Sequence, residues 1–310
     1  MLPYAPDGFR LKEPSLSRLE DTLNSSGFAV TCELNPPKGT DLAPLIAKAE
    51  ALKDLIDGFN LTDSHASRMA MAPIAAAHIL LDHGAEPVLQ ITTRDRNRIA
   101  LQGDLLAAYA LGVRNVVVMG GDPPSTGDHP DAKPVFDLYA AGALDAARGL
   151  AAGHDMAGLT LNGRPRFLLG GVVNPGSSDL GGEIARMEAK IAAGARFFQT
   201  QAIYEPHTFE RFARAVEHLD AALFAGIIPL KSVAMAAYMN EHVPGITVPE
   251  PLIREIAAAD DRVSVGIERA ARLLGEIAPL CRGAHIMALG WEQHIPALLA
   301  QAGISSTRAA

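Results

Sequence analysis

Short runs of apolar residues alternate along the chain with longer stretches in which apolar residues recur at helical spacing. The short runs are rich in Val, Ile, Leu and Phe and do not alternate with polar residues, which is typical of parallel strands buried on both faces. We therefore predict eight strands, at Phe28–Leu34, Gly58–Thr62, Pro87–Thr92, Asn115–Met119, Phe167–Val173, Phe197–Gln201, Leu223–Ile228 and Ala284–Leu289.

The stretches between these runs predict amphipathic helices, among them Asp41–Leu55, Arg98–Leu111 and Leu180–Ala193. Eight strands with seven intervening helical stretches and a terminal helix over roughly 291–302 favour an α/β fold, a single (β/α)8 TIM barrel. An open doubly wound sheet is the alternative, because one sequence does not give the order of the strands.

An additional helix is predicted before the first strand, over Ser15–Leu23, with Leu16, Leu19 and Leu23 on one face. No linker rich in Gly, Ser or Pro divides the chain. The predicted organisation is an N-terminal extension with its helix over 1–27, one catalytic barrel over 28–303 and a tail over 304–310.

Composition limits the classes of function. The formal net charge of −8 disfavours general binding to nucleic acid or to an anionic membrane surface. The N-terminus lacks the apolar core of a signal peptide, and the longest apolar run, Ala221–Leu230, has half the ~20 residues of a membrane helix. We expect a soluble, cytoplasmic protein with Cys32 and Cys281 reduced and packed.

Several catalytic motifs are absent. The sequence has no GxGxxG after a strand, no GxxxxGK[ST] loop and no GxSxG elbow. His78 and His83 are five residues apart and face different sides of a helix, so no metal site is predicted. The charged run Arg94–Arg98 favours a solvated helix start with compensated charges over a phosphate-binding role.

In a barrel of this kind, catalytic and binding residues are expected where the strands end and the following loops begin. Residues 120–134, GGDPPSTGDHPDAKP, form a long proline-rich loop of the kind that serves as a lid or a binding segment. Polar and turn-forming residues gather at the predicted strand ends: Glu33, Thr62, Asp63, Thr92 to Asp95, Gly120 to Asp122, Asn174, Gln201 and Pro229.

Four segments together resemble the methylenetetrahydrofolate reductase family, and the resemblance is strongest to its bacterial branch. They are VTCELNPPKG (30–39), LQITTRDRNRIALQGDLLAAYALGVRNVVVMGGDPP (89–124), GGVVNP (170–175) with EIARMEAKIAAGARFFQTQ (183–201), and AGIIPLKS (225–232). Their order and spacing match over roughly 28–290. The resemblance implies a flavin-dependent (β/α)8 barrel, in agreement with the predicted strands.

The resemblance also implies roles for three residues. Glu33 matches the general acid, which protonates the departing nitrogen when the ring of methylenetetrahydrofolate opens. Asp122 matches an aspartate near flavin and pterin, where a carboxylate accepts pterin hydrogen bonds and stabilises a cation. Gln201 matches a glutamine that contacts folate.

For the cofactor, the resemblance implies FAD near Thr62, Gln90, Gly120, Gly121, Asp122, Asn174, Glu183 and Lys190. Several positions depart from the bacterial branch: Gln90 replaces a histidine, Gly120 an arginine, Gly170 and Asn174 a tyrosine and a histidine after the fifth strand, and Trp291 an arginine that helps to hold folate. These departures are compatible with weakly bound FAD, and glycines at 120, 121, 170 and 171 can let backbone N–H groups approach a ligand.

The sequence thus predicts a methylenetetrahydrofolate reductase that passes hydride from NADH or NADPH through FAD to the folate, or catalyses the reverse oxidation. The alternatives are a folate-binding methyltransferase component without redox chemistry and a non-catalytic subunit that needs a partner. Tetrahydrofolate derivatives are the expected small-molecule partners. A homo-oligomer is compatible with the sequence, which does not set the oligomeric state.

Overall fold

The computed structural model describes residues 16–25 and 27–304, in which eight parallel strands close into a barrel. Each strand pairs with the next, and β8 pairs with β1, for example Val30 with Ala284. This closing pair excludes the open doubly wound sheet. The strands are β1 (Ala29–Leu34), β2 (Gly58–Leu61), β3 (Pro87–Thr92), β4 (Asn115–Met119), β5 (Leu168–Val173), β6 (Phe197–Ala202), β7 (Ala222–Ile227) and β8 (Gly283–Ile286).

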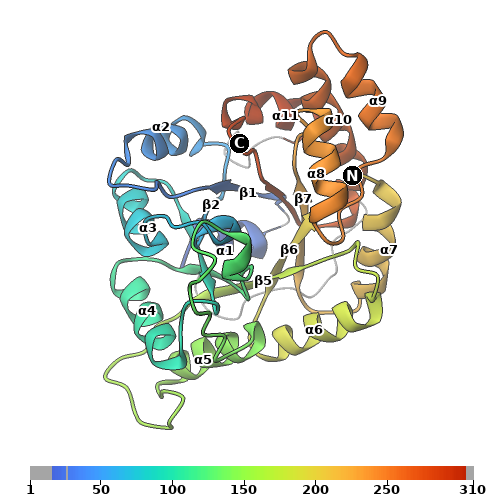
Figure 1. Ribbon diagram of the computed structural model, residues 1–310. Helices are drawn as coiled ribbons and strands as arrows, with labels where there is room; N and C mark the ends of the chain where they lie inside the picture. The colour runs from blue at the N-terminus through green and yellow to red at the C-terminus, as the bar shows by residue number, and fades with distance from the viewer. Residues whose placement is uncertain (1–15, 26, 305–310) are drawn as a thin grey trace.

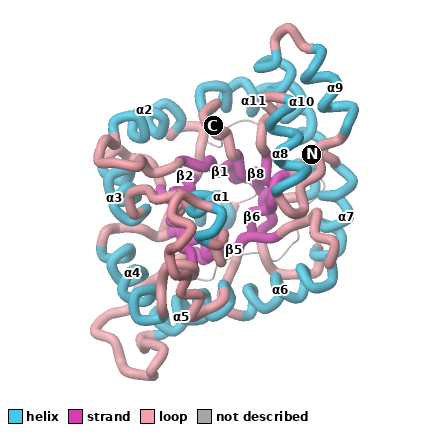
Figure 2. The backbone as a smooth tube through the Cα atoms, in the orientation of Figure 1, coloured by secondary structure: helices cyan, strands magenta, loops and turns pink. Residues whose placement is uncertain are grey.

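Helices ring the barrel on the outside (Figure 1). The larger helices of this ring are α2 (Ala43–Leu52), α3 (Pro73–Asp82), α4 (Arg98–Ala110), α5 (Ala140–Ala152), α6 (Leu180–Ala192), α7 (Pro206–Val216), α8 (Val233–His242), α9 (Glu250–Ala258), α10 (Arg262–Ile277) and α11 (Ile295–Gln301). Short 3-10 turns lie at η1 (His65–Ser67), η2 (Pro124–Thr126), η3 (Ala278–Leu280) and η4 (Glu292–His294). The (β/α)8 prediction is confirmed, and the ring of helices around the strands is clear in Figure 2.

The predicted strands agree with the observed ones to within about three residues at each end, and the largest difference is at β8, which ends at Ile286 rather than at Leu289. The expectation of one helical stretch between consecutive strands is wrong after β7. Three helices, α8, α9 and α10, lie there because Pro244 and Gly245 end the first and Pro249 begins the second, while Asp261 caps the third.

The predicted N-terminal helix is α1 (Arg18–Asn24), and it packs at the amino-terminal end of the barrel. Leu19 and Leu23 are fully buried against interior residues of the strands, including Val117 and Phe197. Leu16 was expected on the same face, but it lies before the cap residue Ser17 and is exposed. The helix therefore closes one end of the barrel, and the opposite end is left for the loops that follow the strands.

Residues 1–15 and 305–310, with most of the predicted extension and tail, lie outside the described residues. Within 16–25 and 27–304, no helix has the length and apolar character that would let it cross a bilayer.

Candidate active site

A cavity of about 510 Å³ opens at the carboxyl ends of the strands. This volume lies in the range of small-molecule sites. Every residue that the sequence assigned to catalysis, substrate or cofactor lines it: Glu33, Thr62, Gln90, Gly120, Gly121, Asp122, Asn174, Glu183, Lys190 and Gln201. Because they come from seven different parts of the chain, only the closed barrel brings them together. Of the other strand-end residues, Thr93, Asp95 and Pro229 do not line the cavity.

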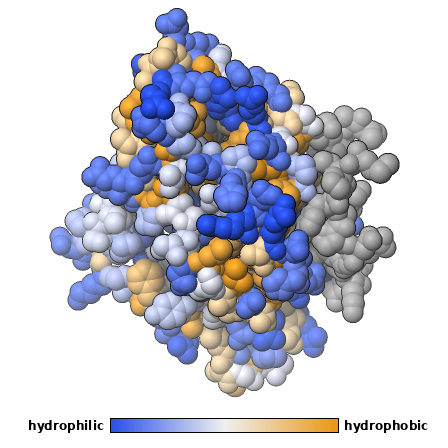
Figure 3. All heavy atoms as spheres, turned by 90° about the vertical axis from the view of Figure 1, so that its right-hand side faces the viewer, coloured by the Kyte–Doolittle hydropathy of each residue, from blue (hydrophilic) through white to orange (hydrophobic). Residues whose placement is uncertain are grey.

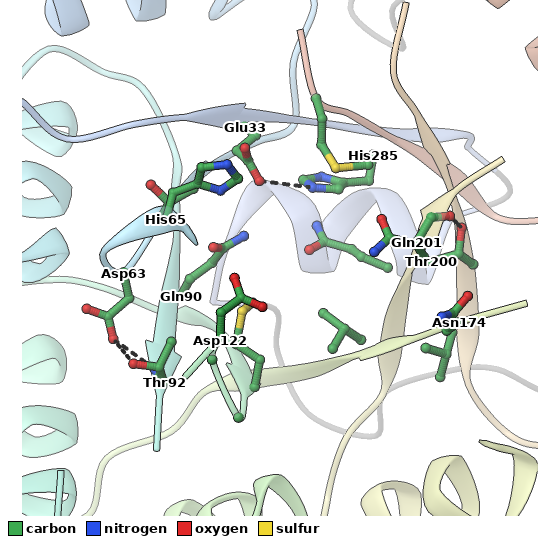
Figure 4. A pocket seen from close by; sticks show the side chains of 18 of the residues that line it. Glu33, Asp63, His65, Gln90, Thr92, Asp122, Asn174, Thr200, Gln201 and His285 are labelled. Atoms are coloured by element: carbon green, nitrogen blue, oxygen red, sulfur yellow. Dashed lines mark hydrogen bonds and ion pairs between the residues drawn. The ribbon is translucent and has the colours of Figure 1, made fainter. Parts of the chain in front are cut away.

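Glu33 lies near the end of β1 with its carboxyl turned into the cavity (Figure 4). Its side chain is 9% exposed, and burial raises its pKa, an effect that the charge of His65 partly offsets. Nε2 of His285 lies 4.0 Å from its carboxylate, which is longer than a hydrogen bond. Burial therefore favours the protonated carboxyl, the form that can donate a proton.

His285 comes from β8, next to β1, and it is almost fully buried. Burial lowers the pKa of His285 to about 3, so its ring is neutral near pH 7. Its Nδ1 lies 3.0 Å from the Thr31 hydroxyl. A neutral imidazole contributes no charge that would lower the pKa of Glu33, and this arrangement keeps the carboxyl of Glu33 available as an acid.

A buried polar layer closes the floor of the cavity. The amide of Gln199 on β6 exchanges two hydrogen bonds with the amide of Asn60 on β2, at 2.8 and 2.9 Å. Nε2 of Gln199 also donates to the Thr31 hydroxyl at 3.1 Å. These bonds cross the barrel from one wall to the other and satisfy the polar groups that stand below Glu33.

Asp122 lies in the long loop between β4 and α5, and its carboxylate points into the cavity beside Gln90 (Figure 4). The backbone of the loop is held in place, because the carbonyl of Asp122 accepts bonds from the Ser67 hydroxyl at 2.6 Å and from Arg94 Nη1 at 3.3 Å. Farther along the loop, Asp128 pairs with Lys38 at 2.6 Å. The loop thus crosses from β4 to the turn after β1 and forms part of the cavity wall.

All three arginines of the run Arg94–Arg98 are ion-paired. Arg94 pairs with Asp95, Arg96 with Asp63 and Asp104, and Arg98 with Asp137. The expected charge compensation is confirmed, but the expected solvation is wrong for the first arginine. The side chain of Arg94 is only 4% exposed and lines the cavity, because it reaches inward to the loop of Asp122. Asp63 also lines the cavity, and its carboxylate accepts bonds from the backbone N–H and the hydroxyl of Thr92.

The polar groups on the β5 side already have protein partners. Glu183, in the first turn of α6, accepts a bond from the backbone N–H of Asn174 at 3.0 Å and pairs with Arg186 at 2.7 Å. Lys190, two turns later, donates to the carbonyl of Val172 at 2.6 Å, and burial lowers its pKa. Both side chains line one wall, as their seven-residue spacing predicts.

Gln201 lies two residues after Gln199 in β6, beside an irregularity in the strand. The register of β6 against β7 shifts between Gln199 and Ala202, and the Thr200 hydroxyl accepts a bond from the N–H of Gly226 at 2.8 Å. A side chain at 226 would lie 2.2 Å from the carbonyl oxygen of Thr200, so glycine is required there. Because side chains alternate along a strand, Gln201 faces the same side as Gln199, and both line the cavity.

The four glycines at 120, 121, 170 and 171 differ in the space beside their backbone. A Cβ at Gly120 would meet nothing within 4 Å, so this glycine leaves room at the cavity wall, whereas a Cβ at Gly121, which has a φ of +85°, would lie 3.0 Å from the side chain of Thr92. The same prediction is wrong for Gly170 and Gly171. They lie inside β5 rather than after it, their space is filled by Phe197 and by Phe198 with Lys190, and neither lines the cavity. Trp291 also lies away from the cavity, beneath the ammonium group of Lys231.

Sequence reasoning missed His65, His285, Gln199 and Thr200, which also line the cavity. His285 and Gln199 could have been found from strand alternation, since each lies within a predicted strand among apolar residues. His65 carried no such signal, because it lies in a turn whose course depends on the loop of Asp122.

A second cavity, of about 410 Å³, lies outside the barrel between α7, α9 and α10. Its walls are mostly apolar, with the ion pair of Glu255 and Arg269 at 2.5 Å. Figure 3 shows this side of the molecule, where apolar patches interrupt the polar surface. Among the described residues, no group of three or more His, Cys, Asp or Glu side chains is arranged to hold a metal ion.

Comparison with known proteins decides the family. Residues 18–303 match the family described as methylenetetrahydrofolate reductase. The chain belongs to this family. It is 25% identical over 311 residues to methylenetetrahydrofolate reductase 2 of Schizosaccharomyces pombe, covering 94% of this chain and 48% of the yeast protein. It is 24% identical over 238 residues to a probable methylenetetrahydrofolate reductase (NADPH) of Caenorhabditis elegans, covering 73% of this chain and 34% of that protein.

The chain therefore spans about half, or less, of the length of these two relatives of the methylenetetrahydrofolate reductase family. A solved structure with the same fold is an uncharacterised protein from Clostridium thermocellum that binds two copies of 5-methyl-5,6,7,8-tetrahydrofolic acid. The TM-score is 0.60 at 17% identity, and the alignment covers 91% of this chain and 96% of that one. At this identity the likeness supports the fold.

Proposed function

We propose that this chain catalyses the reduction of 5,10-methylenetetrahydrofolate to 5-methyltetrahydrofolate, with NADH or NADPH as hydride donor and FAD as the intermediate carrier. The observation that carries the proposal is Glu33, a buried carboxyl with a raised pKa that faces a cavity of small-molecule size at the carboxyl ends of the strands. Membership of the family and the folate bound by the Clostridium thermocellum protein support the substrate class.

Glu33, Asp122 and Gln201 each have a role that follows from the chemistry of the side chain. Glu33 donates a proton to the nitrogen that departs as the five-membered ring opens, which leaves a cationic iminium on the folate. The carboxylate of Asp122, across the cavity, stabilises this cation and accepts hydrogen bonds from the pterin. The amide of Gln201 both donates and accepts, which suits the edge of the heterocycle.

The residues of the cavity fit a bound flavin. The open space beside Gly120 lets a main-chain N–H group approach a planar ring. Thr62, Gln90 and Asn174 offer further polar contacts, while Glu183 and Lys190 would have to share or exchange their present protein partners. When bound, FAD would supply hydride transfer between the nicotinamide and the folate.

The single barrel of the described residues offers one large polar cavity, so the nicotinamide and the folate would use it in turn. The same residues serve the reverse reaction, the oxidation of 5-methyltetrahydrofolate. A second candidate, a folate-binding methyltransferase component, is favoured by one observation: Gly120 and Gln90 offer no cationic group where the bacterial branch of the family has an arginine and a histidine.

Absorption spectra test the proposal. Purified protein is mixed anaerobically with NADH or NADPH, with and without added FAD, and methylenetetrahydrofolate is then added. We expect a bound flavin that bleaches with the pyridine nucleotide and recovers with the folate. If no flavin binds and no pyridine nucleotide is oxidised, while folate still binds, the reductase proposal is wrong and the methyltransferase component is supported.

The role of Glu33 is tested by Glu33→Gln, which keeps the shape but cannot donate a carboxyl proton. We expect the folate half-reaction to fall by ~10²-fold or more, with reduction of flavin by NAD(P)H nearly unchanged. The matched control is Glu241→Gln, at a side chain that is 75% exposed. An equal loss in both half-reactions would contradict the acid role.

A further inference from the structure

The turn after β2 is held in a conformation that its sequence does not favour. Ser64, Ala66 and Ser67 all have positive φ, at 53°, 51° and 55°, and none of them is glycine. A left-handed conformation costs a non-glycine residue of order 1–3 kcal/mol, and it persists where the surrounding structure fixes it. Such strain commonly marks a functional site, which directs attention to the residue inside the turn, His65.

The loop of Asp122 fixes this turn. The Ser67 hydroxyl donates to the carbonyl of Asp122 at 2.6 Å and accepts from Arg94 Nη1 at 2.9 Å. Gly127 packs so closely that a Cβ there would lie 1.8 Å from the carbonyl oxygen of Ser67. The turn and the loop therefore form one unit, and the position of His65 depends on the same contacts that position Asp122.

The imidazole of His65 points across the cavity mouth toward the carboxyl of Glu33 (Figure 4). The positive charge of His65 lowers the pKa of Glu33, so the two groups are electrostatically coupled. His65 is exposed, whereas Glu33 is shielded. The second histidine beside Glu33, His285, is buried and neutral down to about pH 3, so it does not exchange protons with solvent near pH 7.

We propose that His65 returns a proton to Glu33 in every turnover and thereby acts through Glu33 rather than on the folate. After Glu33 has given its proton to the departing nitrogen, the imidazolium N–H of His65 is transferred to the carboxylate, directly or through one water molecule. His65 is left neutral and takes a new proton from solvent. No electrons move in this step, and the reverse reaction uses the same path in the opposite direction.

This inference rests on the proposed function, since it requires Glu33 to lose a proton in each cycle. The charged and titratable groups that line the cavity with His65 are Glu33, Asp63, Arg94, Asp122, Glu183, Arg186, Lys190 and His285. Glu183 pairs with Arg186, and Lys190 donates to the carbonyl of Val172. Arg94 and Asp63 are already ion-paired, with Asp95 and Arg96. Glu33 and Asp122 are therefore the cavity groups with which a change at His65 is expected to interact.

The test uses the whole chain and three variants: His65→Ala, His65→Gln and the control His207→Gln, at an exposed residue of α7. Folate turnover is measured between pH 5.5 and 8.5 with and without imidazole in the buffer, and reduction of flavin by NAD(P)H is measured separately. We expect both His65 variants to lose ~10-fold or more in folate turnover, with the flavin half-reaction unchanged.

Imidazole should restore a large part of the turnover of His65→Ala, because the cavity mouth that the ring occupies is open to solvent, and it should not accelerate the control. Unchanged turnover and an unchanged pH profile in His65→Gln would overturn the inference and leave the proposed function intact. A loss that imidazole does not restore, together with lower thermal stability, would show that His65 only supports the turn. A wild-type protein without folate turnover would overturn both proposals.

Discussion

His285 makes the stability of this protein depend on pH in a way that can be calculated. Its imidazole is almost fully buried between β1 and the cavity floor, and burial lowers its pKa to about 3. In the unfolded chain a histidine has a pKa of ~6.5. Between these two values the unfolded state binds one more proton than the folded state, so the free energy of unfolding rises with pH over this window.

The magnitude follows from linkage. One group of this kind contributes up to ~1.4 kcal/mol for each pH unit, and between pH 7 and pH 5 the integrated contribution is roughly 2 kcal/mol. This stability is fully present above pH ~6.5 and is lost as the pH falls toward the folded value. Glu33 acts in the opposite direction, because its pKa is raised and its burial costs stability once the unfolded carboxyl is ionised.

The assay is urea unfolding of the wild type and of His285→Asn at pH 7, 6 and 5, with His207→Asn as the control for loss of a histidine at an exposed position. Asparagine retains a polar group that can face Thr31 but does not titrate. We expect the loss of stability from pH 7 to pH 5 to be roughly 2 kcal/mol smaller in His285→Asn than in the wild type. Equal losses would refute the reasoning and would mean that His285 is protonated beside Glu33 in the folded protein.

Three further substitutions test the packing of the barrel. Gly170→Ala would place a Cβ 2.4 Å from the ring of Phe197, so we expect a loss of ~1–3 kcal/mol in thermal or urea unfolding, whereas Gly120→Ala, with open space around it, should be close to neutral for stability. Equal stability of the two variants would contradict the assigned packing. Leu19→Ala removes a fully buried side chain from the closed end of the barrel and should cost ~2–5 kcal/mol, with folate binding measured by fluorescence titration unchanged; weaker binding would show that α1 influences the opposite end.

The sequence by itself determined the elements and most of the candidate site. The strands could be placed because parallel strands buried on both faces are continuous apolar runs, and such runs as Asn115–Met119 stand out from the amphipathic helices around them. Once the strands were placed, their ends identified Glu33, Asp122 and Gln201, because the chemistry of a barrel gathers where strands end. The sequence motifs also led to the correct family.

Only the tertiary structure decided how these residues meet. Closure of β8 onto β1 brings His285 beside Glu33, a contact between residues about 250 positions apart that no local pattern encodes. The left-handed turn around His65 runs against local propensity and exists because the loop of Asp122 holds it. For the same reason Gly170 proved to be a packing position, since the ring that fills its space comes from the neighbouring strand. Local sequence sets what each segment can form, while long-range packing selects which strained or buried arrangements are kept.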